Sequence, residues 1–243
     1  MITSINNDKV KYYTKLMNNK KLRDNDRVFI VEGEHLVSEA INSGVVIELL
    51  ISDKKYEKYE VYEHQYVTVD IIRKICDTMT PQGIIALCKQ QEVKSFTRYN
   101  RLLLLDNIQD PGNLGTLIRS CDAFNFDGMV LNLQTVDVYN PKVVRATQGA
   151  IFRVPVIRQD LKSYISYLRS KDVKIFGTAL VGESLSKIKP SENMAFILGN
   201  EGNGIDKEIL KMTDINIYIE MNGRSESLNV GVAGSIIMYN FRK

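Results

Sequence analysis

Several features that mark common classes of protein are scarce in this chain of 243 residues. It has three cysteines and two histidines, and they form no cluster with the spacing of a zinc site. Nucleophilic catalysis by a serine or cysteine is hard to build from two scattered histidines, His35 and His64. We therefore expect a protein whose chemistry needs neither a metal ion nor an imidazole.

Long apolar segments are also missing. No run approaches the roughly 18 apolar residues of a membrane span, and the first residues lack the apolar stretch of a secretory signal. The hydrophobic fraction of 44% and the charged fraction of 25% are ordinary for a globular protein. We predict a cytoplasmic protein without a membrane segment, with reduced thiols at Cys76, Cys88 and Cys121.

Positive charge is concentrated near the start of the chain, although the net charge is only +3. Residues 1–27 contain seven lysines and arginines against three aspartates. Such a segment can contact the phosphates of a nucleic acid, or it can be the solvated face of a helix. Charge alone leaves both readings open. The candidate RNA contacts are Lys9, Lys11, Lys20 and Lys21.

Short apolar runs alternate with helix-like stretches along the chain. In the first part we predict strands over residues 28–31, 46–51, 66–69 and 84–87, and helices over 34–42 and 70–78. A polar stretch over residues 90–100 has the composition of a linker. The sequence therefore predicts two domains, over residues 1–95 and 96–243.

The second domain is predicted to be an α/β domain in which helices cover a parallel sheet. Its expected strands are residues 101–106, 128–131, 173–178, 195–198 and 215–219, and its expected helices are residues 113–124 and 225–241. Asn113 is expected to cap the first of these helices, and Ser225 or Ser227 the second.

Three segments of this domain have the composition of ligand-binding loops. The first runs from Asp106 to Arg119 (DNIQDPGNLGTLIR), where a buried strand passes through a Pro-Gly turn into a helix. Ligands of open α/β sheets bind at the carboxyl ends of the strands, which favours a site here. The alternative is a simple turn with a capping asparagine and a surface arginine.

The second segment, residues 196–205 (FILGNEGNGI), brings glycines that let a ligand approach the backbone. Their order fits neither a P-loop nor a dinucleotide fingerprint, and a tight turn is the alternative. The third segment, residues 219–233 (IEMNGRSESLNVGVA), leads from a strand into a helix. Gly231 and Gly234 inside that helix each cost ~1 kcal/mol relative to alanine, so we expect a close packing contact to compensate.

Taken in order, these segments resemble the three motifs of the SpoU (TrmH-like) branch of the SPOUT methyltransferases: N-L-G-x-x-x-R, L-G-N-E-G-x-G and S-L-N-V-x-V-A. Residues 139–150 (YNPKVVRATQGA) resemble the segment that lies between the family's motifs. The resemblance covers residues 101–243. The first 95 residues resemble more loosely a small RNA-binding domain related to ribosomal protein L30e.

The resemblance implies a catalytic α/β domain with a deep trefoil knot, a homodimer, and no metal. The implied reaction transfers a methyl group from S-adenosylmethionine to a ribose 2′-hydroxyl of structured RNA. The implied cofactor contacts are Thr178, Ala179, Leu180, Leu198, Gly199, Asn200, Gly202, Ile219, Met221 and Leu228.

The resemblance also implies a set of catalytic residues: Asn113, Arg119, Glu201, Ser227 and Asn229. Arg145 is a weaker candidate for RNA contact. By family analogy Arg119 is the base that accepts the hydroxyl proton, but a guanidinium titrates above ~12 and stays charged. It could more easily hold a phosphate or stabilise developing negative charge. The chemical role of Arg119 therefore stays open.

Two positions depart from the family's pattern, since Glu220 stands where proline is common and Thr147 where serine is common. Neither belongs to the implied catalytic set. We expect ribosomal RNA as the substrate, the large subunit before the small, because the minimal tRNA-modifying members usually lack such an N-terminal domain. The alternatives are a tRNA methyltransferase, a methyltransferase that confers antibiotic resistance, and a non-catalytic RNA-binding or ribosome-assembly factor.

Overall fold

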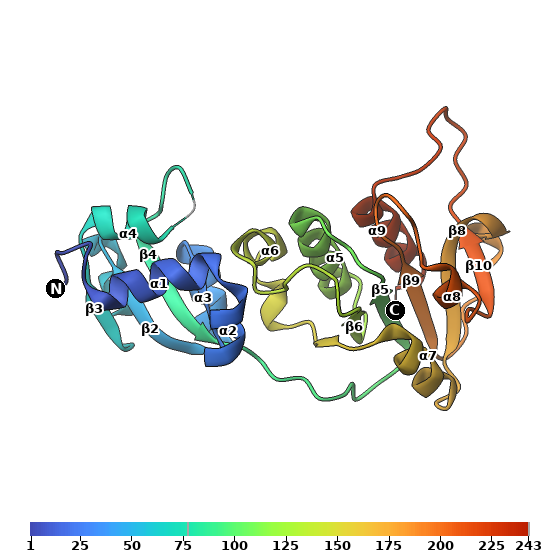
Figure 1. Ribbon diagram of the computed structural model, residues 1–243, viewed down its shortest axis with the longest axis horizontal. Helices are drawn as coiled ribbons and strands as arrows, with labels where there is room; N and C mark the ends of the chain where they lie inside the picture. The colour runs from blue at the N-terminus through green and yellow to red at the C-terminus, as the bar shows by residue number, and fades with distance from the viewer. Residues whose placement is uncertain (77, 243) are drawn as a thin grey trace. The chain divides into compact units, whose positions relative to one another are not determined.

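The computed structural model of the protein describes residues 1–76 and 78–242 and divides the chain into two compact units. The first unit comprises Met1–Glu92 together with Asp137–Arg153, and the second comprises Val93–Val136 and the chain from Val154 onward. Both are mixed α/β structures (Figure 1). The sequence analysis predicted two domains, each a continuous stretch of the chain. It did not predict that residues 137–153 pack with the first unit.

The first unit is built on a mixed sheet with the strand order β1 (Val28–Glu32), β4 (Ile84–Lys89), β2 (Val46–Ile51) and β3 (His64–Tyr66). β4 runs antiparallel to β1 and β2, whereas β2 and β3 are parallel. Alternate residues of a strand point to opposite faces. Phe29 and Val31 accordingly belong to one apolar core, and Val28 and Ile30 to another.

Helices cover both faces of this sheet. α1 (Asp8–Asn18) and α4 (Val69–Ile75) share one core, and α3 (Glu34–Asn42), α6 (Pro141–Thr147) and η2 (Ala150–Phe152) share the other. Two further elements are α2 (Lys20–Asp26) and η1 (Lys54–Tyr59). The basic residues of the first 27 positions therefore lie on and around α1 and α2.

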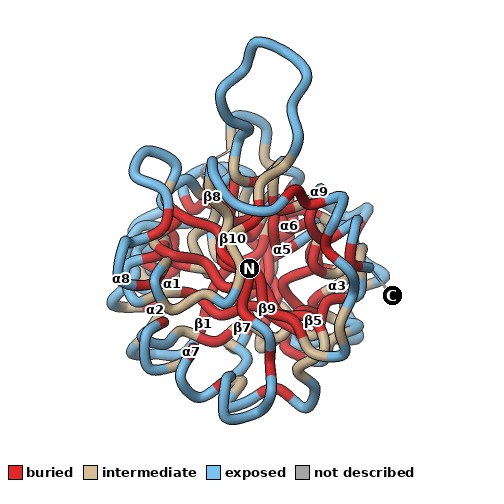
Figure 2. The backbone as a smooth tube through the Cα atoms, turned by 90° about the vertical axis from the view of Figure 1, so that its right-hand side faces the viewer, coloured by how far each residue is buried: buried red, intermediate tan, exposed pale blue. Residues whose placement is uncertain are grey.

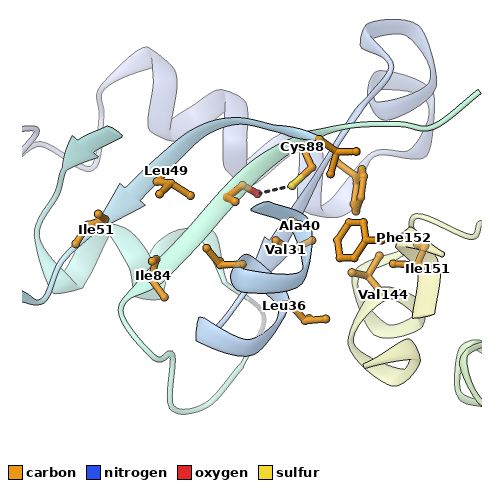
Figure 3. Packing of buried hydrophobic residues seen from close by; sticks show 14 of the residues in the cluster. Val31, Leu36, Ala40, Leu49, Ile51, Ile84, Cys88, Val144, Ile151 and Phe152 are labelled. Atoms are coloured by element: carbon orange, nitrogen blue, oxygen red, sulfur yellow. Dashed lines mark hydrogen bonds between the residues drawn. The ribbon is translucent and has the colours of Figure 1, made fainter. Parts of the chain in front are cut away.

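Residues 137–153 join the first unit through apolar packing and one buried ion pair. Val144, Ile151 and Phe152 lie in the core cluster that contains residues of β1 and α3 (Figure 3). Arg23 Nη2 lies 2.6 Å from Asp137 Oδ2, and these side chains are only 4% and 9% exposed. The same guanidinium donates to two backbone carbonyls near the end of α1.

Removal of the acidic partner is predicted to destabilise the first unit. In Asp137→Ala the Arg23 guanidinium stays buried without its counter-charge, which should lower the free energy of unfolding by about 3 kcal/mol in a urea titration. Asp24→Ala removes an exposed partner of Lys20 and should change stability far less. Equal effects of the two substitutions would show that the buried pair does not anchor residues 137–153.

The second unit is built on a parallel sheet with the order β10 (Ile215–Tyr218), β8 (Lys174–Ser184), β9 (Met194–Leu198), β5 (Arg101–Leu105), β6 (Gly128–Leu131) and β7 (Val156–Arg158). Parallel strands buried on both faces are continuously apolar. This explains why every residue of β5 and β9 is buried.

Helices again cover both faces. α7 (Leu161–Arg169) and α8 (Lys207–Leu210) share a core with alternate residues of β5 and β9. α5 (Pro111–Ala123) and α9 (Val230–Asn240) pack on each other and on the opposite face, where the rings of Phe196 and Phe241 stack 4.7 Å apart. A short η3 (Leu185–Lys187) follows β8. No helix in the described ranges is long and apolar enough to cross a membrane.

The structure corrects several predicted boundaries. β3 (His64–Tyr66) shares only Tyr66 with the strand predicted over residues 66–69, and α4 begins at Val69. The helix expected over residues 70–78 ends at Ile75, and its residue 77 lies outside the described part of the chain. α5 begins two residues before Asn113, and its cap is Asp110, whose Oδ1 accepts the Asn113 N–H at 2.8 Å.

The start of the last helix also differs from the prediction. α9 begins at Val230, and Asn229 caps it by accepting the N–H groups of Gly231 and Val232. Ser225 and Ser227 are therefore not caps, and residues 225–229 precede the helix. The sequence analysis did not predict five of the helices or one of the strands: α1, α2, α6, α7, α8 and β7. It also ended β8 at residue 178, whereas the strand continues to Ser184.

Candidate functional site

The predicted site segments meet at the carboxyl edge of the second unit's sheet. β5 leads into residues 106–110, β9 into residues 199–206 and β10 into residues 219–229. The last of these segments projects from the unit between β10 and α9 (Figure 1), and nearly all of its residues are exposed (Figure 2). The site consists of loops that have to be held in place by side chains.

The Glu201 carboxylate holds the first and second segments together. It accepts the backbone N–H groups of Gln109 and Asp110 at 3.3 and 3.2 Å, and Asn113 Nδ2 donates to it at 3.0 Å. Partial burial acts to raise the pKa of Glu201, but these hydrogen bonds outweigh it and the net pKa is lowered. Glu201 is therefore an ionised carboxylate whose oxygens are used within the protein.

Asn113 extends this connection to the third segment. Its side chain is buried, and its Oδ1 accepts a hydrogen bond from Asn229 Nδ2 at 2.9 Å. Because Asn229 also caps α9, a continuous chain of hydrogen bonds runs from Glu201 through Asn113 to the first turn of α9. We call these three residues the Glu201–Asn113–Asn229 network.

Close packing of α5 and α9 explains the glycines inside the last helix. A Cβ on Gly234 would lie 2.3 Å from a methyl of Leu117 and 2.6 Å from one of Leu198, and a Cβ on Gly231 would crowd Thr116. The expected compensating contact is confirmed for Gly234. Without these glycines α9 would be pushed away from α5, and Asn229 would separate from Asn113.

The second segment folds back on itself immediately after β9. Asn200 and Gly204 exchange backbone hydrogen bonds, and Asn200 Oδ1 accepts the N–H groups of Gly202 and Asn203. A Cβ on Gly199 would lie 2.1 Å from the backbone carbon of Gly204, so only glycine permits this turn. The turn leaves residues 201–204 exposed at the sheet edge.

The predicted cofactor residues of β8 lie in a bulge. Consecutive residues of β10, Asn216 and Ile217, pair with Gly177 and Glu183 of β8, so residues 178–182 have no partner in β10. Thr178 Oγ1 donates to a carbonyl of β9 at 3.0 Å, and Ala179 is half-buried. The Leu180 side chain is 77% exposed.

The remaining predicted cofactor residues belong to the same edge of the sheet. Leu198 is buried at the end of β9, and Ile219 is half-buried directly after β10. Met221 and Leu228, in the projecting segment, are 37% and 36% exposed. The hydroxyls of Ser184 and Ser186 lower the pKa of Glu220 and tie the start of that segment to the end of β8.

Two members of the predicted catalytic set stand apart from the network. Arg119 is exposed on α5, and Ser227 is exposed in the segment before α9. Neither side chain forms a hydrogen bond or ion pair with any of residues 1–76 and 78–242. The structure thus brings Asn113, Glu201 and Asn229 together and leaves Arg119 and Ser227 available to other molecules.

Sequence reasoning missed several residues that shape this edge. Asp106, which is 2% exposed, accepts hydrogen bonds from Asn132 Nδ2 at 2.8 Å and from the Asp206 N–H at 2.7 Å. It thereby ties the carboxyl ends of β5 and β6 to the second segment. The signal in the sequence was an acidic residue directly after the apolar run of residues 102–105. Asn107 Oδ1 is buried beside it without a partner among the described residues.

The predicted RNA contacts of the first unit are mostly engaged in ion pairs. Lys9 pairs with Glu48, Lys11 with Asp8, and Lys20 with Asp24, while Lys21 has no ion pair within the described ranges. Arg145 is half-buried on α6. Across the part of the chain that the structure covers, no group of His, Cys, Asp or Glu is placed to hold a metal ion.

Comparison with known proteins places the chain in a family. Residues 100–239 match the SpoU rRNA Methylase family, and residues 7–86 match the MRM3-like substrate binding domain. The first match spans more than half of the chain and includes all three segments described above. The protein belongs to the SpoU family of rRNA methylases.

Individual relatives resemble the whole chain. It is 42% identical to the 23S rRNA (guanosine(2553)-2′-O)-methyltransferase RlmP of Bacillus subtilis, over 99% of this chain and 98% of that protein. The AdoMet-bound rRNA methyltransferase from Sinorhizobium meliloti has a TM-score of 0.90 at 28% identity, over 98% and 95% of the two chains. A TrmH-family protein from Porphyromonas gingivalis has a TM-score of 0.89, also at 28% identity, over 98% of each chain.

The lowered pKa of Glu201 predicts a pH-dependent contribution to stability. Ionised Glu201 stabilises the fold fully above the ordinary glutamate pKa of about 4.3, and this contribution is lost as the pH falls through the lower folded value. Glu201→Gln should therefore lower the melting temperature at neutral pH. The difference from wild type should shrink in acid, as differential scanning calorimetry can measure.

A matched control is Glu192→Gln, which alters an exposed carboxylate that accepts no hydrogen bond in the described ranges. It should leave the melting temperature unchanged at both pH values. A Glu201→Gln deficit that is as large in acid as at neutral pH would show that the ionised carboxylate is not what joins the two segments.

Proposed function

We propose that the protein methylates a ribose 2′-hydroxyl of large-subunit ribosomal RNA, with S-adenosylmethionine as the methyl donor. The observation that carries the proposal is 42% identity, over essentially the whole chain, to an enzyme named for that reaction on 23S rRNA. Residues 96–243 would form the catalytic domain and residues 1–95 the domain that binds the substrate. The matches over residues 100–239 and 7–86 support this division.

The residues at the sheet edge fit S-adenosylmethionine. Large apolar side chains are exposed in the segments that share the sheet edge with the glycine turn: Leu180 and Val181, in the bulge of β8, are 77% and 82% exposed, and Met221 and Leu228, after β10, are 37% and 36% exposed. Exposed apolar side chains that gather at one place mark a binding surface. With the exposed backbone of residues 201–204 they offer apolar walls and open backbone for an adenosine group.

The three network residues act as positioning residues in this proposal. Glu201 accepts hydrogen bonds from the first segment, and both ends of the Asn113 and Asn229 amides are used within the protein. Their polar atoms are occupied, so their role is to fix where the cofactor loop, α5 and α9 lie. Positioning of this kind is a large part of catalysis when the reaction is a single in-line displacement.

Bound S-adenosylmethionine supplies an electrophilic methyl group. The chain has to hold the ribose oxygen in line with it and stabilise the charge that develops there as the proton leaves. The exposed Arg119 guanidinium has no hydrogen-bond or ion-pair partner among the described residues, so we assign it this electrostatic role or a phosphate contact. Ser227, equally exposed, is placed to donate to a phosphate.

In the first unit, Lys21 is the proposed RNA contact that best fits the structure, and Arg145 is retained as a weaker candidate. Lys21 is exposed without an ion pair among the described residues. Ion pairs at Lys9, Lys11 and Lys20 make these lysines weaker candidates, although exposed pairs cost little to break. We further propose that the protein works in the cytoplasm, because its relative acts on ribosomal RNA of a bacterium.

The chain path is compatible with the implied knot. From β10, at one edge of the sheet, the chain returns past β8 and β9 to place α9 against α5, which follows β5. A knot forms only if this return passes through the projecting loops. We retain the knot as part of the proposal. Asn229 and Gly234 then hold the returned helix in place.

The reaction is tested by mapping 2′-O-methyl groups in total RNA from cells with and without the gene. One ribosomal nucleotide should lose its 2′-O-methyl group when the gene is deleted and regain it when the wild-type gene is returned. Arg119→Ala should lower the rate of methyl transfer about 100-fold. Arg169→Ala, which breaks an exposed ion pair outside the site, should restore the site fully.

Other patterns decide between the alternatives. A site lost only from tRNA would replace ribosomal RNA as the substrate. No lost site in any RNA would overturn the enzymatic proposal in favour of a non-catalytic RNA-binding factor.

We propose a homodimer as the working form, because α9 leaves an apolar face uncovered. Val232, Ile236 and Tyr239 recur at i, i+4 and i+7 and are 47%, 36% and 55% exposed. Ile236→Asp should shift the protein toward monomers in sedimentation equilibrium, while Asn240→Asp on the same helix should not. A monomeric wild type at micromolar concentration would contradict the proposal.

A further inference from the structure

A cleft in the second unit plays no part in the site described above. Its volume is about 260 Å³, and it lies between α7 and residues 94–95, which precede β5. The residues that line it are Lys94, Ser95, Gln159, Asp160, Ser163, Tyr164 and Tyr167. α7 packs on the sheet face opposite α5, so the cleft is separate from Arg119.

One wall of the cleft is a rigid aromatic cluster. The Tyr164 and Tyr167 rings lie 5.5 Å apart, and both contact rings from the linker, Phe96 and Tyr99. The hydroxyls of Tyr99 and Tyr167 are 2.9 Å apart, within hydrogen-bond distance. Tyr167 nevertheless remains 40% exposed, with Lys171 Nζ over its ring at 5.7 Å from the centroid. An aromatic ring that is both fixed and exposed can stack on a planar ligand with little loss of side-chain entropy.

Polar groups of different kinds converge on the same cleft. The side chains of Lys94 and Gln159 and the hydroxyl of Tyr164 form no hydrogen bond with any residue that the structure describes. Asp160 caps α7 by accepting the N–H of Ser163 at 2.9 Å, and this hydrogen bond lowers the pKa of Asp160. The cleft therefore offers an ionised acceptor, an amide and a cation around an aromatic surface.

We propose that this cleft binds an unpaired nucleobase of the RNA substrate, stacked on Tyr167. Proteins recognise RNA sequence mainly through bases that are splayed out of the helix, stacked on aromatic rings and read along their edges. Asp160 would accept N–H groups of the base edge, which favours a base with amino or imino donors. Lys94 would contact the adjoining phosphate. The inference rests on the proposed function, since it concerns the RNA of that reaction.

The location of the cleft suits a second contact with the same RNA. Gln159 and Asp160 directly follow the carboxyl end of β7, so this end of the cleft lies at the sheet edge that carries the transfer site, whereas Tyr167 lies further along α7 beside Tyr99, which precedes β5. Lys162 on α7 lies 3.7 Å from Asp206, which ends the glycine-rich second segment. A nucleotide held in the cleft would position the RNA without touching the cofactor.

The test measures RNA affinity and cofactor affinity separately in the full-length protein. Tyr167→Leu removes the stacking surface, and the KM for a large-subunit rRNA transcript should rise about tenfold. The Kd for S-adenosylmethionine and the rate at saturating RNA should not change. Tyr167→Phe keeps the ring and should behave like wild type. If wild type methylates the transcript and the KM for RNA is unchanged in Tyr167→Leu, the inference about the cleft is overturned while the proposed function stands.

A second variant guards against a folding defect in Tyr167→Leu. Lys94→Gln alters an exposed linker side chain, and it should weaken RNA binding and reduce the salt dependence by about one phosphate contact. Lys189→Gln, another exposed lysine of the second unit, is the control. Transcripts carrying 4-thiouridine or 6-thioguanosine should cross-link to Tyr167 or Tyr164. Cross-links confined to other regions would also overturn the inference, whereas a wild type that methylates no RNA would defeat the proposed function itself.

Discussion

The Glu201–Asn113–Asn229 network is the constraint on which the site depends. Three loops leave different strands of a parallel sheet, and loops have no hydrogen-bond ladder to fix their positions. The Glu201 carboxylate accepts N–H groups from the start of α5, and the Asn113 amide passes the connection to the cap of α9. Hydrogen bonds to an ionised acceptor are stronger than neutral ones, which makes a small network sufficient.

Close backbone packing makes this network geometrically possible. Gly199 allows the second segment to turn directly after β9, and Gly234 allows α9 to approach α5. Gly234 weakens the helix in which it lies, and the close contact with α5 compensates for that loss. The segments proposed to bind the cofactor leave residues 180–182 and most of residues 219–229 exposed around this fixed centre. A rigid junction between exposed loops is what a cofactor-dependent methyl transfer requires.

The sequence predicted several buried strands well, because runs such as residues 102–105 are apolar throughout, and the family resemblance implied the residues that meet. It did not predict that Asn113 is a bridging side chain, since Asp110 and Asn113 are equally good caps from composition alone. It also missed that residues 137–153 pack with the first unit. The Arg23–Asp137 pair that anchors them joins positions far apart in the chain. Arg119 was predicted as catalytic, but its side chain forms no hydrogen bond or ion pair with the described residues. The structure therefore does not reveal its chemical role.

The most direct test of the account supplies purified protein with labelled S-adenosylmethionine and large-subunit ribosomal RNA, then digests the product to nucleosides. The account predicts that all transferred label is recovered in one 2′-O-methylated nucleoside. It also predicts that Asn113→Ala loses cofactor affinity together with activity. Label on a base, or full cofactor affinity in Asn113→Ala, would contradict the claim that this network builds a ribose methylation site.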